Sequence, residues 1–394
     1  MFNSIFVGLS GMNAFSSGLR QISNNITNLN STGFKSSNVQ FGDLVRTGYD
    51  PNSVQGQGVQ LGKSRTNFSQ GELRQTSRGL DLAIDGQGFF ILLRNGEHFL
   101  TRTGSFEVDA NGDIVLAGTD YKLASLGPSG IPQVISITQN IYSPPVETTS
   151  VKFTGNLSSS AGAGTHTIPL SVFDKTGASI NWRVIFTRDE TSIGTAPPKV
   201  DWIVEVRNAS NVALPTQRLK FVNGAVVEAS KRMTFADAES GLAIEFDFSQ
   251  GVSPFANGNR SDLAVAANGR NGRDRGDLTD VTVNAEGKVE LVYSNQDKIQ
   301  IGDVAVAKPA EPQALGEVGR GIFRLEDLSD ATIASSFTKG VGKVVANRIE
   351  ASNVDLSKEF GDLILIQRGY QASSQIVSAS NEMIQQLFGI RGQG

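Results

Sequence analysis

The chain of 394 residues contains no cysteine and only two histidines, His98 and His166. The absence of cysteine excludes disulfide bridges and thiolate metal sites. Two histidines leave few candidates for a nucleophile with its base or for an imidazole-rich metal centre. We therefore expect a protein that is not an enzyme and that has no catalytic residues, metal or cofactor.

Long apolar runs and an excess of positive charge are also lacking. No apolar run reaches the ~18 residues that a membrane-spanning helix needs. The formal net charge is −4, which argues against nucleic acid as a main partner. No basic residue precedes Arg20, and no A-x-A site follows an apolar stretch, so we expect no cleaved signal peptide and no membrane insertion. By these rules alone the protein would be assigned to the cytoplasm.

Glycine, serine, threonine and asparagine are abundant, with 43 glycines in the chain. This composition favours turn-rich β structure in the middle of the chain over a doubly wound α/β fold. The length exceeds that of one comfortable hydrophobic core, so two or three domains are expected.

The carboxyl-terminal stretch predicts a long helix from Val354 to Phe388. Ser352 and Asp355 resemble a capping box at its start, and Gly389 is placed as its stop. Such a rod of about 50 Å needs other helices beside it. Apolar or small residues recur at spacings of three and four, as in a heptad repeat: Leu363, Ile366, Tyr370, Ser373, Val377, Ser380, Ile384 and Leu387.

The amino-terminal residues predict a second helix that ends near Gly33. Gly8, Gly11 and Gly18 lie in its interior, and each costs roughly 1 kcal/mol relative to alanine. We expect both terminal helices to become stable mainly by packing on copies of themselves; the alternative is a two-helix core element inside one subunit. The apolar positions of this helix are Ile5, Leu9, Met12, Leu19, Ile22, Ile26 and Leu29.

Residues 71–126 show the pattern of short strands and tight turns. Asn95-Gly96 is a two-residue hairpin turn, and residues 109–113 form a second turn. The spacing of Asp109, Asn111 and Asp113 only partly matches an EF-hand loop, because its glycine and closing glutamate are misplaced. The predicted strands are residues 82–84, 89–93, 98–102, 106–108 and 114–116.

Pro144-Pro145 marks a boundary, after which residues 146–277 predict an inserted β barrel or sandwich. Residues 257–276 predict a solvated loop; its arginines could form an anion or RNA patch, but interleaved aromatic residues are missing. After Asp280 the alternation of apolar residues resumes in 281–293 and 299–306. The insert's predicted strands are 168–173, 180–186, 202–206, 219–222 and 242–248, and the arginines are Arg260, Arg270, Arg273 and Arg275.

Residues 23–35, SNNITNLNSTGFK, resemble the amino-terminal signature of the axial proteins of the bacterial flagellum. The sequence departs from that signature at Thr27, where alanine is common, and at Ser31, where threonine is usual. A generic capped helix end is the alternative interpretation. The matching residues are Asn24, Asn25, Ile26, Asn28, Gly33, Phe34 and Lys35.

Two further blocks strengthen the resemblance. Residues 71–90, GELRQTSRGLDLAIDGQGFF, with the following LTRTGSFEVDANGD, resemble the inner β domain of hook and rod proteins. Residues 347–387 resemble the carboxyl-terminal signature of the hook-protein family, and Gln367, Arg368 and Tyr370 match its core.

The resemblance to the flagellar hook-protein family extends over nearly the whole chain and implies an α+β multidomain fold. Residues 1–34 and 352–394 would form a coiled-coil-like core domain of terminal helices. Connecting segments would cover 35–72 and 335–351. The inner β domain would comprise 73–145 and 279–334, with an outer β domain, 146–278, inserted into it.

The resemblance also implies a function. The chain would be the structural subunit of the flagellar hook, a flexible tubular universal joint that transmits torque from the rod to the filament. Its partners would be copies of itself, the rod and hook–filament junction proteins, and during assembly the hook cap and the type III export apparatus. Export without a cleaved signal would place it in the extracellular hook. A distal rod protein and a secreted β-domain adhesin are the alternatives.

Overall fold

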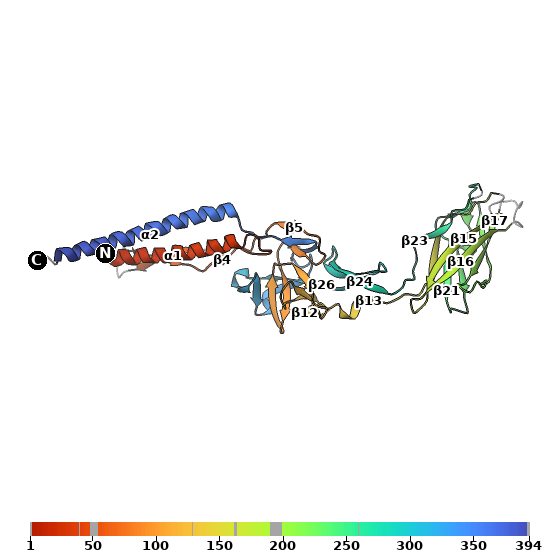
Figure 1. Ribbon diagram of the computed structural model, residues 1–394, viewed down its shortest axis with the longest axis horizontal. Coiled ribbons are helices and arrows are strands. Elements are labelled where there is room, and N and C mark those ends of the chain that lie inside the picture. Colours follow the sequence, from red (N-terminus) through yellow and green to blue (C-terminus); the bar gives the residue numbers. More distant parts are fainter. Residues whose placement is uncertain are drawn as a thin grey trace. The chain divides into compact units, whose positions relative to one another are not determined.

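The computed structural model describes residues 2–38, 40–47, 54–127, 129–160, 164–189, 199–258 and 260–391. The chain divides into two compact units. The helix-bearing unit comprises Met1–Gln139, Asp280–Leu291 and Ile299–Gly394, and the sandwich unit comprises Asn140–Thr279 and Val292–Lys298. The described residues form two terminal α-helices and otherwise mainly strands (Figure 1), which confirms the predicted mixture of elements.

The helices α1 (Phe2–Thr27) and α2 (Leu356–Arg391) lie side by side, and both chain ends are at the same end of the pair (Figure 1). The predicted start of α2 was wrong. Asp355 is its N-cap, because its Oδ1 accepts the N–H groups of Ser357 at 2.9 Å and Lys358 at 3.2 Å. The predicted stop at Gly389 was also wrong, since the helix continues through it to Arg391. The predicted end of the first helix near Gly33 was wrong, since α1 ends at Thr27 and turns follow it; Gly33 itself has the positive φ expected of it, +70°.

The helix-bearing unit contains most of a 13-stranded sheet, and its central order is β24-β25-β26-β11-β7-β8-β28-β27. The Asn95-Gly96 turn joins β7 to β8 with φ values of +52° and +81°, as two-residue hairpins require. Besides the strands of the segment before β5, the helix-bearing unit contains β5 (Leu73–Gln75), β6 (Leu82–Asp85), β7 (Phe89–Arg94), β8 (Glu97–Thr101), β9 (Phe106–Val108), β10 (Ile114–Leu116), β11 (Lys122–Leu126), β12 (Pro132–Val134), β26 (Lys298–Pro309), β27 (Gly316–Gly319), β28 (Ile322–Leu325), β29 (Ala331–Ser335), β30 (Lys343–Ala346) and β31 (Arg348–Glu350). β24 (Gly276–Val283) and β25 (Lys288–Tyr293) each run from one unit into the other.

The segment expected to be a connection with little structure contains a hairpin. β2 (Phe41–Thr47) pairs antiparallel with β3 (Val54–Leu61), and β1 (Ser37–Asn38) pairs with β4 (Arg65–Thr66). The hairpin packs on α1, where Ser10 Oγ accepts the Val59 N–H at 3.2 Å. The glycine- and glutamine-rich sequence of this segment did not indicate strands. Gly58 is required in β3 because a Cβ atom there would collide with the Ser10 side chain.

The sandwich unit consists of two five-stranded sheets. One has the order β15-β16-β17-β18-β19 with antiparallel neighbours; the other has β20-β21-β14-β22, with β23 also paired to β14. The strands of these two sheets are β14 (Ser150–Asn156), β15 (Thr165–Phe173), β16 (Ser179–Arg188), β17 (Lys199–Arg207), β18 (Gln217–Val222), β19 (Ala225–Val226), β20 (Arg232–Ala236), β21 (Ala243–Asp247), β22 (Val252–Ser253) and β23 (Ala264–Arg270). The short β13 (Tyr142–Ser143) pairs instead with β24 of the 13-stranded sheet.

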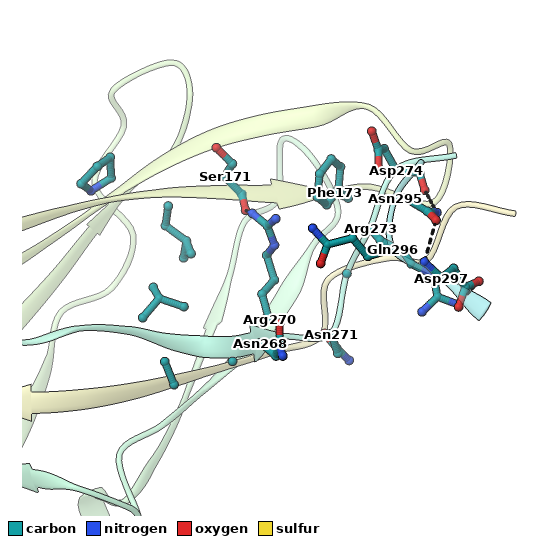
Figure 2. A pocket seen from close by; sticks show the side chains of 16 residues that line it. Ser171, Phe173, Asn268, Arg270, Asn271, Arg273, Asp274, Asn295, Gln296 and Asp297 are labelled. Atoms are coloured by element: carbon teal, nitrogen blue, oxygen red, sulfur yellow. Dashed lines mark hydrogen bonds and ion pairs between the residues drawn. The ribbon is translucent and has the colours of Figure 1, made fainter. Parts of the chain in front are cut away.

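The loop predicted over residues 257–276 was partly wrong, because it contains β23. This strand pairs antiparallel with β14, and its end forms one wall of a polar groove (Figure 2). Asn268 has a φ of +58°, and the register against β14 shifts between Val151 and Phe153. The irregular strand has no clear period of two, which is why its sequence resembles a loop.

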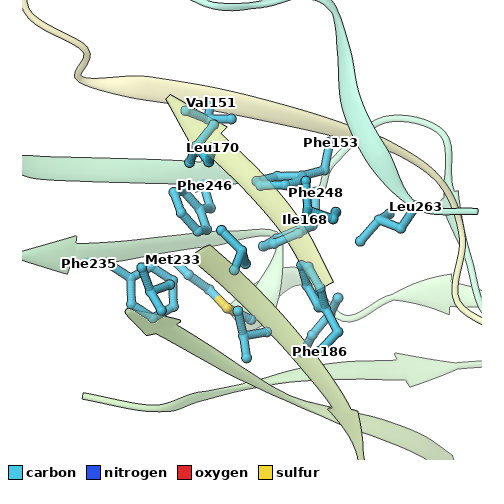
Figure 3. Packing of buried hydrophobic residues seen from close by; sticks show 14 of the residues in the cluster. Val151, Phe153, Ile168, Leu170, Phe186, Met233, Phe235, Phe246, Phe248 and Leu263 are labelled. Carbon is cyan, nitrogen blue, oxygen red and sulfur yellow. The ribbon is translucent and has the colours of Figure 1, made fainter. Parts of the chain in front are cut away.

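The two sheets of the sandwich share one hydrophobic core (Figure 3). Phe153 stacks on Phe248 with ring centroids 4.9 Å apart, and Phe246 meets Phe153 edge-on at 5.1 Å. Trp182 and Trp202 are also fully buried. Alternate residues of β15 and β16 face this core, so the strand pattern of the sequence predicted the inward-facing side chains correctly.

Neither helix of the described chain has a stretch long and apolar enough to cross a membrane. Within the same residues, no three histidine or acidic side chains come together as a metal site.

Candidate assembly surface on the helix pair

Glycines allow α1 and α2 to approach closely. A Cβ atom at Gly8 would lie 2.7 Å from Val377 Cγ2, and one at Gly18 would lie 2.7 Å from Ile366 Cδ1. A Cβ atom at Gly11 would likewise lie 2.7 Å from Ser373 Oγ. The α2 side chains therefore occupy the space that a larger α1 residue would need.

At one position the roles are reversed, and a glycine of α2 makes room for a side chain of α1. A Cβ at Gly369 would lie 2.5 Å, 2.7 Å and 2.8 Å from three ring atoms of Phe15. Gly361, two turns earlier on the same helix, has nothing within 4 Å of the corresponding point. The structure thus pairs the terminal helices within one chain, as in the alternative interpretation, and the glycines that weaken each helix permit that pairing.

The predicted interface residues divide into three groups in the subunit. Ile22 and Ile366 are buried, with 6% and 8% of their surface exposed. Leu9 and Tyr370 are exposed. Leu387 lies in α2, but its side chain is outside the described residues. The half-buried group is Ile5, Met12, Leu19, Ile26, Leu29, Leu363, Val377 and Ile384; Leu29 lies in the turn after α1.

A second set of apolar side chains was missed from the sequence. Leu365, Ile376 and Met383 are exposed by 68%, 45% and 48%. Their spacings of eleven and seven residues place them on one stripe of α2, hereafter the exposed stripe. Phe6 of α1 and Phe360 and Ile364 of α2 add further exposed apolar surface. The heptad rule assigns a single apolar face to α2, and that face does not include the stripe. In the sequence the stripe is indicated only by the spacing of eleven and seven residues between its members. Exposed apolar side chains aligned along one helix make this stripe a candidate interaction surface.

A buried ionic cluster joins the bases of the helices to the β structure. Glu350 Oε1 lies 2.5 Å from Lys35 Nζ, and its Oε2 lies 3.1 Å from Arg102 Nη1. All three side chains are almost fully buried. Glu350 also accepts the Gly71 N–H at 2.8 Å, and Lys35 donates to the Ser69 carbonyl at 2.8 Å. One carboxylate thus connects four segments that are distant in sequence.

Burial sets the electrostatics of this cluster. Loss of hydration lowers the pKa of Lys35 from its ordinary value of 10.5, and the attraction of Glu350 opposes that effect. Burial likewise lowers the pKa of Arg102. Since two cations share one carboxylate, removing that carboxylate would leave both charges uncompensated in a low-dielectric site.

Asn25 connects the two helices with a second polar contact. Its Nδ2 donates to Glu359 Oε1 at 2.9 Å, and its Oδ1 accepts the Ser37 N–H at 3.1 Å. Glu359 is only 4% exposed, and burial raises its pKa above 4.5, with a smaller contribution in the same direction from Asp362. The hydrogen bond from Asn25 acts in the opposite direction.

The other signature residues have unequal environments. Gly33 donates its N–H to the Glu350 carbonyl at 2.7 Å, and Phe34 is half-buried beside it. Asn28 bonds back to Asn24, its Nδ2 donating to the Asn24 carbonyl at 2.9 Å. The remaining two, Gln367 and Arg368, are exposed on α2.

The sandwich unit has a polar groove of about 710 Å³ (Figure 2). Arg270 lies 4.8 Å over the ring of Phe173 and donates to the Ser171 carbonyl. Arg273 pairs with Asp297 at 2.8 Å. Both guanidinium groups are engaged within the subunit, which favours the interpretation as ordinary surface over an anion or RNA patch.

Two family models match the chain. Residues 345–390 match the carboxyl-terminal model of the flagellar basal body rod FlgEFG proteins. Residues 83–158 match the D1 domain model of the flagellar hook proteins FlgE/F/G. These are the regions of α2 and of the β6–β14 segment.

Curated relatives match along the whole chain. The flagellar hook protein FlgE of Salmonella typhimurium is 28% identical over 412 residues, covering 97% of this chain and 98% of the relative. The FlgE protein of Brucella suis is 29% identical over 415 residues, covering 99% of each. The chain is a homologue of the flagellar hook proteins. The resemblance inferred from the signature residues is therefore confirmed.

Hook proteins of lower sequence identity also match the chain. The Treponema pallidum FlgE protein is 26% identical over 465 residues, covering 99% of this chain and 100% of the relative. The crystal structure of the Helicobacter pylori hook protein FlgE2 matches 71% of this chain and 100% of its own, with 12% identity and a TM-score of 0.49.

Proposed function

We propose that this chain is the structural subunit of a bacterial flagellar hook and that it polymerises through its helix pair into a tube. The observation that carries the proposal is the exposed stripe on α2, in a homologue of hook proteins along its full length. Because the side chains of the stripe are 45–68% exposed in the subunit, burying each against a neighbouring subunit would contribute roughly 0.7–2 kcal/mol. We propose no enzymatic activity for the chain.

In the proposed polymer, residues 1–34 and 352–394 form the helical core domain. Residues 73–145 with 279–334 form the inner β domain, and 146–278 form the outer one, inserted into the inner. The segments 35–72 and 335–351 connect them. A head-to-tail contact between unlike surfaces, repeated along a helical lattice, yields an open filament. The terminal helices would carry the continuous load, while outer domains slide past their neighbours and let the tube bend as it turns.

The same proposal assigns the location and the partners. The subunit would pass through the flagellar type III export apparatus without a cleaved signal and assemble beneath the hook cap. The hook would lie outside the cell, continuous with the basal body, between the rod and the hook–filament junction proteins. It would transmit torque as a universal joint.

Assembly of charged variants tests the role of the exposed stripe. Ile376→Asp should abolish polymerisation, because it places a carboxylate in an apolar contact. The soluble subunit should stay folded with only a partial loss of helix-pair packing, since Ile376 is already 45% exposed there and only its Cγ2 lies near Gly8 of α1. Gln375→Asp is the matched control, because it places the same new charge one residue away at an exposed polar position of α2. Normal tubes from Ile376→Asp would refute the assignment of this stripe.

A further inference from the structure

Phe337 is an exposed aromatic residue in an unfavourable backbone conformation. Its side chain is 79% exposed, and its φ is +59°. A bulky non-glycine residue rarely adopts the left-handed region, where its Cβ crowds the backbone. Such strain persists only where the surrounding structure enforces it, and it is concentrated at functional positions.

The loop that presents Phe337 is firmly anchored. The Phe337 N–H donates to the Gly342 carbonyl at 3.1 Å, and the Thr338 hydroxyl donates to the Ser335 carbonyl at 2.7 Å. Ser336 is buried on one side, where its Oγ accepts the Val344 N–H at 3.0 Å. Val341 is buried on the other. The fold therefore holds the aromatic ring outward on a rigid support.

An apolar groove on the same unit has the size to receive an aromatic ring. It has a volume of about 260 Å³ between α1, α2 and β2. The rings of Phe15 and Phe41 form one wall, with centroids 5.5 Å apart, and Ile366 lies at the floor. An apolar cavity of about 150 Å³ already accepts benzene.

The charges of the loop and the groove are complementary. Lys339, two residues after Phe337, is exposed on the loop. On α2, the half-buried Asp362 and the exposed Lys358 line the groove, whereas Glu359 is buried, so Asp362 is the acidic group of the groove that a cation can reach. A cation beside the inserted ring would meet a carboxylate at the rim, and such pairs give contacts their orientation.

We propose that Phe337 of one subunit inserts into the Phe15–Phe41 groove of another copy, with Lys339 beside Asp362. The inference rests on the proposed polymer and names one of its contacts. The two surfaces are different patches of the same unit, so the contact is heterologous and propagates from copy to copy. Aromatic anchors in such pockets dominate the energetics of many interfaces.

Critical concentrations for polymerisation of the full-length chain test the inserted ring. Phe337→Asn should raise the critical concentration about tenfold or more, as loss of a hot-spot aromatic does, and asparagine tolerates a positive φ, so the soluble subunit should melt no lower than the wild type. Phe337→Tyr keeps the ring and should assemble within about twofold of the wild type.

Charge reversal tests the position of the groove. Lys339→Glu and Asp362→Lys should each weaken assembly, and the double variant should recover most of the loss, because each copy then carries the reversed pair. Normal assembly of Phe337→Asn would overturn the insertion, and a double variant no better than the worse single one would overturn the pairing with Asp362. A wild-type chain that forms no tubes would instead refute the proposed function itself.

Discussion

Gly361 and Gly369 lie two turns apart on α2, and replacement by alanine has opposite expected effects at the two positions. Gly361 is exposed, with nothing within 4 Å of a new Cβ. Gly361→Ala should therefore stabilise α2 by about 1 kcal/mol through helix propensity alone. Gly369→Ala gains the same propensity but drives its methyl group into the Phe15 ring, at distances of 2.5–2.8 Å.

The magnitude at Gly369 follows from the packing of that ring. Phe15 also contacts Phe41, with ring centroids 5.5 Å apart, so the ring cannot move aside freely. Overpacking of this kind costs about 1–3 kcal/mol, and subtracting the propensity gain leaves a net loss of about 0–2 kcal/mol. The two variants should therefore differ by about 1–3 kcal/mol in helix-pair stability.

Hydrogen exchange of the α1 and α2 amides in the soluble subunit measures this difference directly. Exchange in the helix pair should be about 5- to 150-fold faster in Gly369→Ala than in Gly361→Ala, with the sandwich unit unchanged as the internal reference. If both substitutions slow exchange equally, the helices do not pack on each other in the soluble subunit, and the close approach at these glycines is wrong.

Three further predictions concern the ionic cluster, the pH response and the sandwich. Glu350→Gln leaves Lys35 and Arg102 buried without their carboxylate and should destabilise the helix-bearing unit by about 3–5 kcal/mol; an unchanged melting temperature would contradict the role of the cluster. Because burial raises the pKa of Glu359, its contribution to helix-pair stability is full below pH ~4.5 and is lost as the pH rises through the higher folded-state value. Glu359→Gln should remove that part of the pH dependence, and identical pH profiles of the two proteins would refute the assignment. A fragment of residues 146–277 contains the whole shared core of the sandwich and should melt cooperatively by calorimetry; a broad, non-cooperative melt would show that this core depends on the helix-bearing unit.

Local patterns in the sequence predicted much of the fold. The heptad spacing predicted both terminal helices, and the Asn95-Gly96 turn with its flanking alternation predicted the β7–β8 hairpin. Several strands were missed, and two of them, β3 and β23, are rich in glycine, glutamine or asparagine. β3 is held by its pairing with β2 and by contact with α1, and β23 by its pairing with β14, rather than by their own propensity.

The candidate site was less predictable for two physical reasons. A heptad rule assigns one apolar face to a helix, so it indicated the face of α2 that packs on α1 and omitted Leu365, Ile376 and Met383. The ionic cluster joins Lys35 to Glu350 across 315 residues of sequence. No local pattern encodes such a long-range pair, although the match of Lys35 to a family signature had already marked it as a notable position.

Electron microscopy of the purified, concentrated chain tests the central claim most directly. If the chain is a hook subunit that polymerises through its helix pair, the micrographs should show tubes of uniform diameter. Discrete particles under all conditions of concentration and salt would contradict the account.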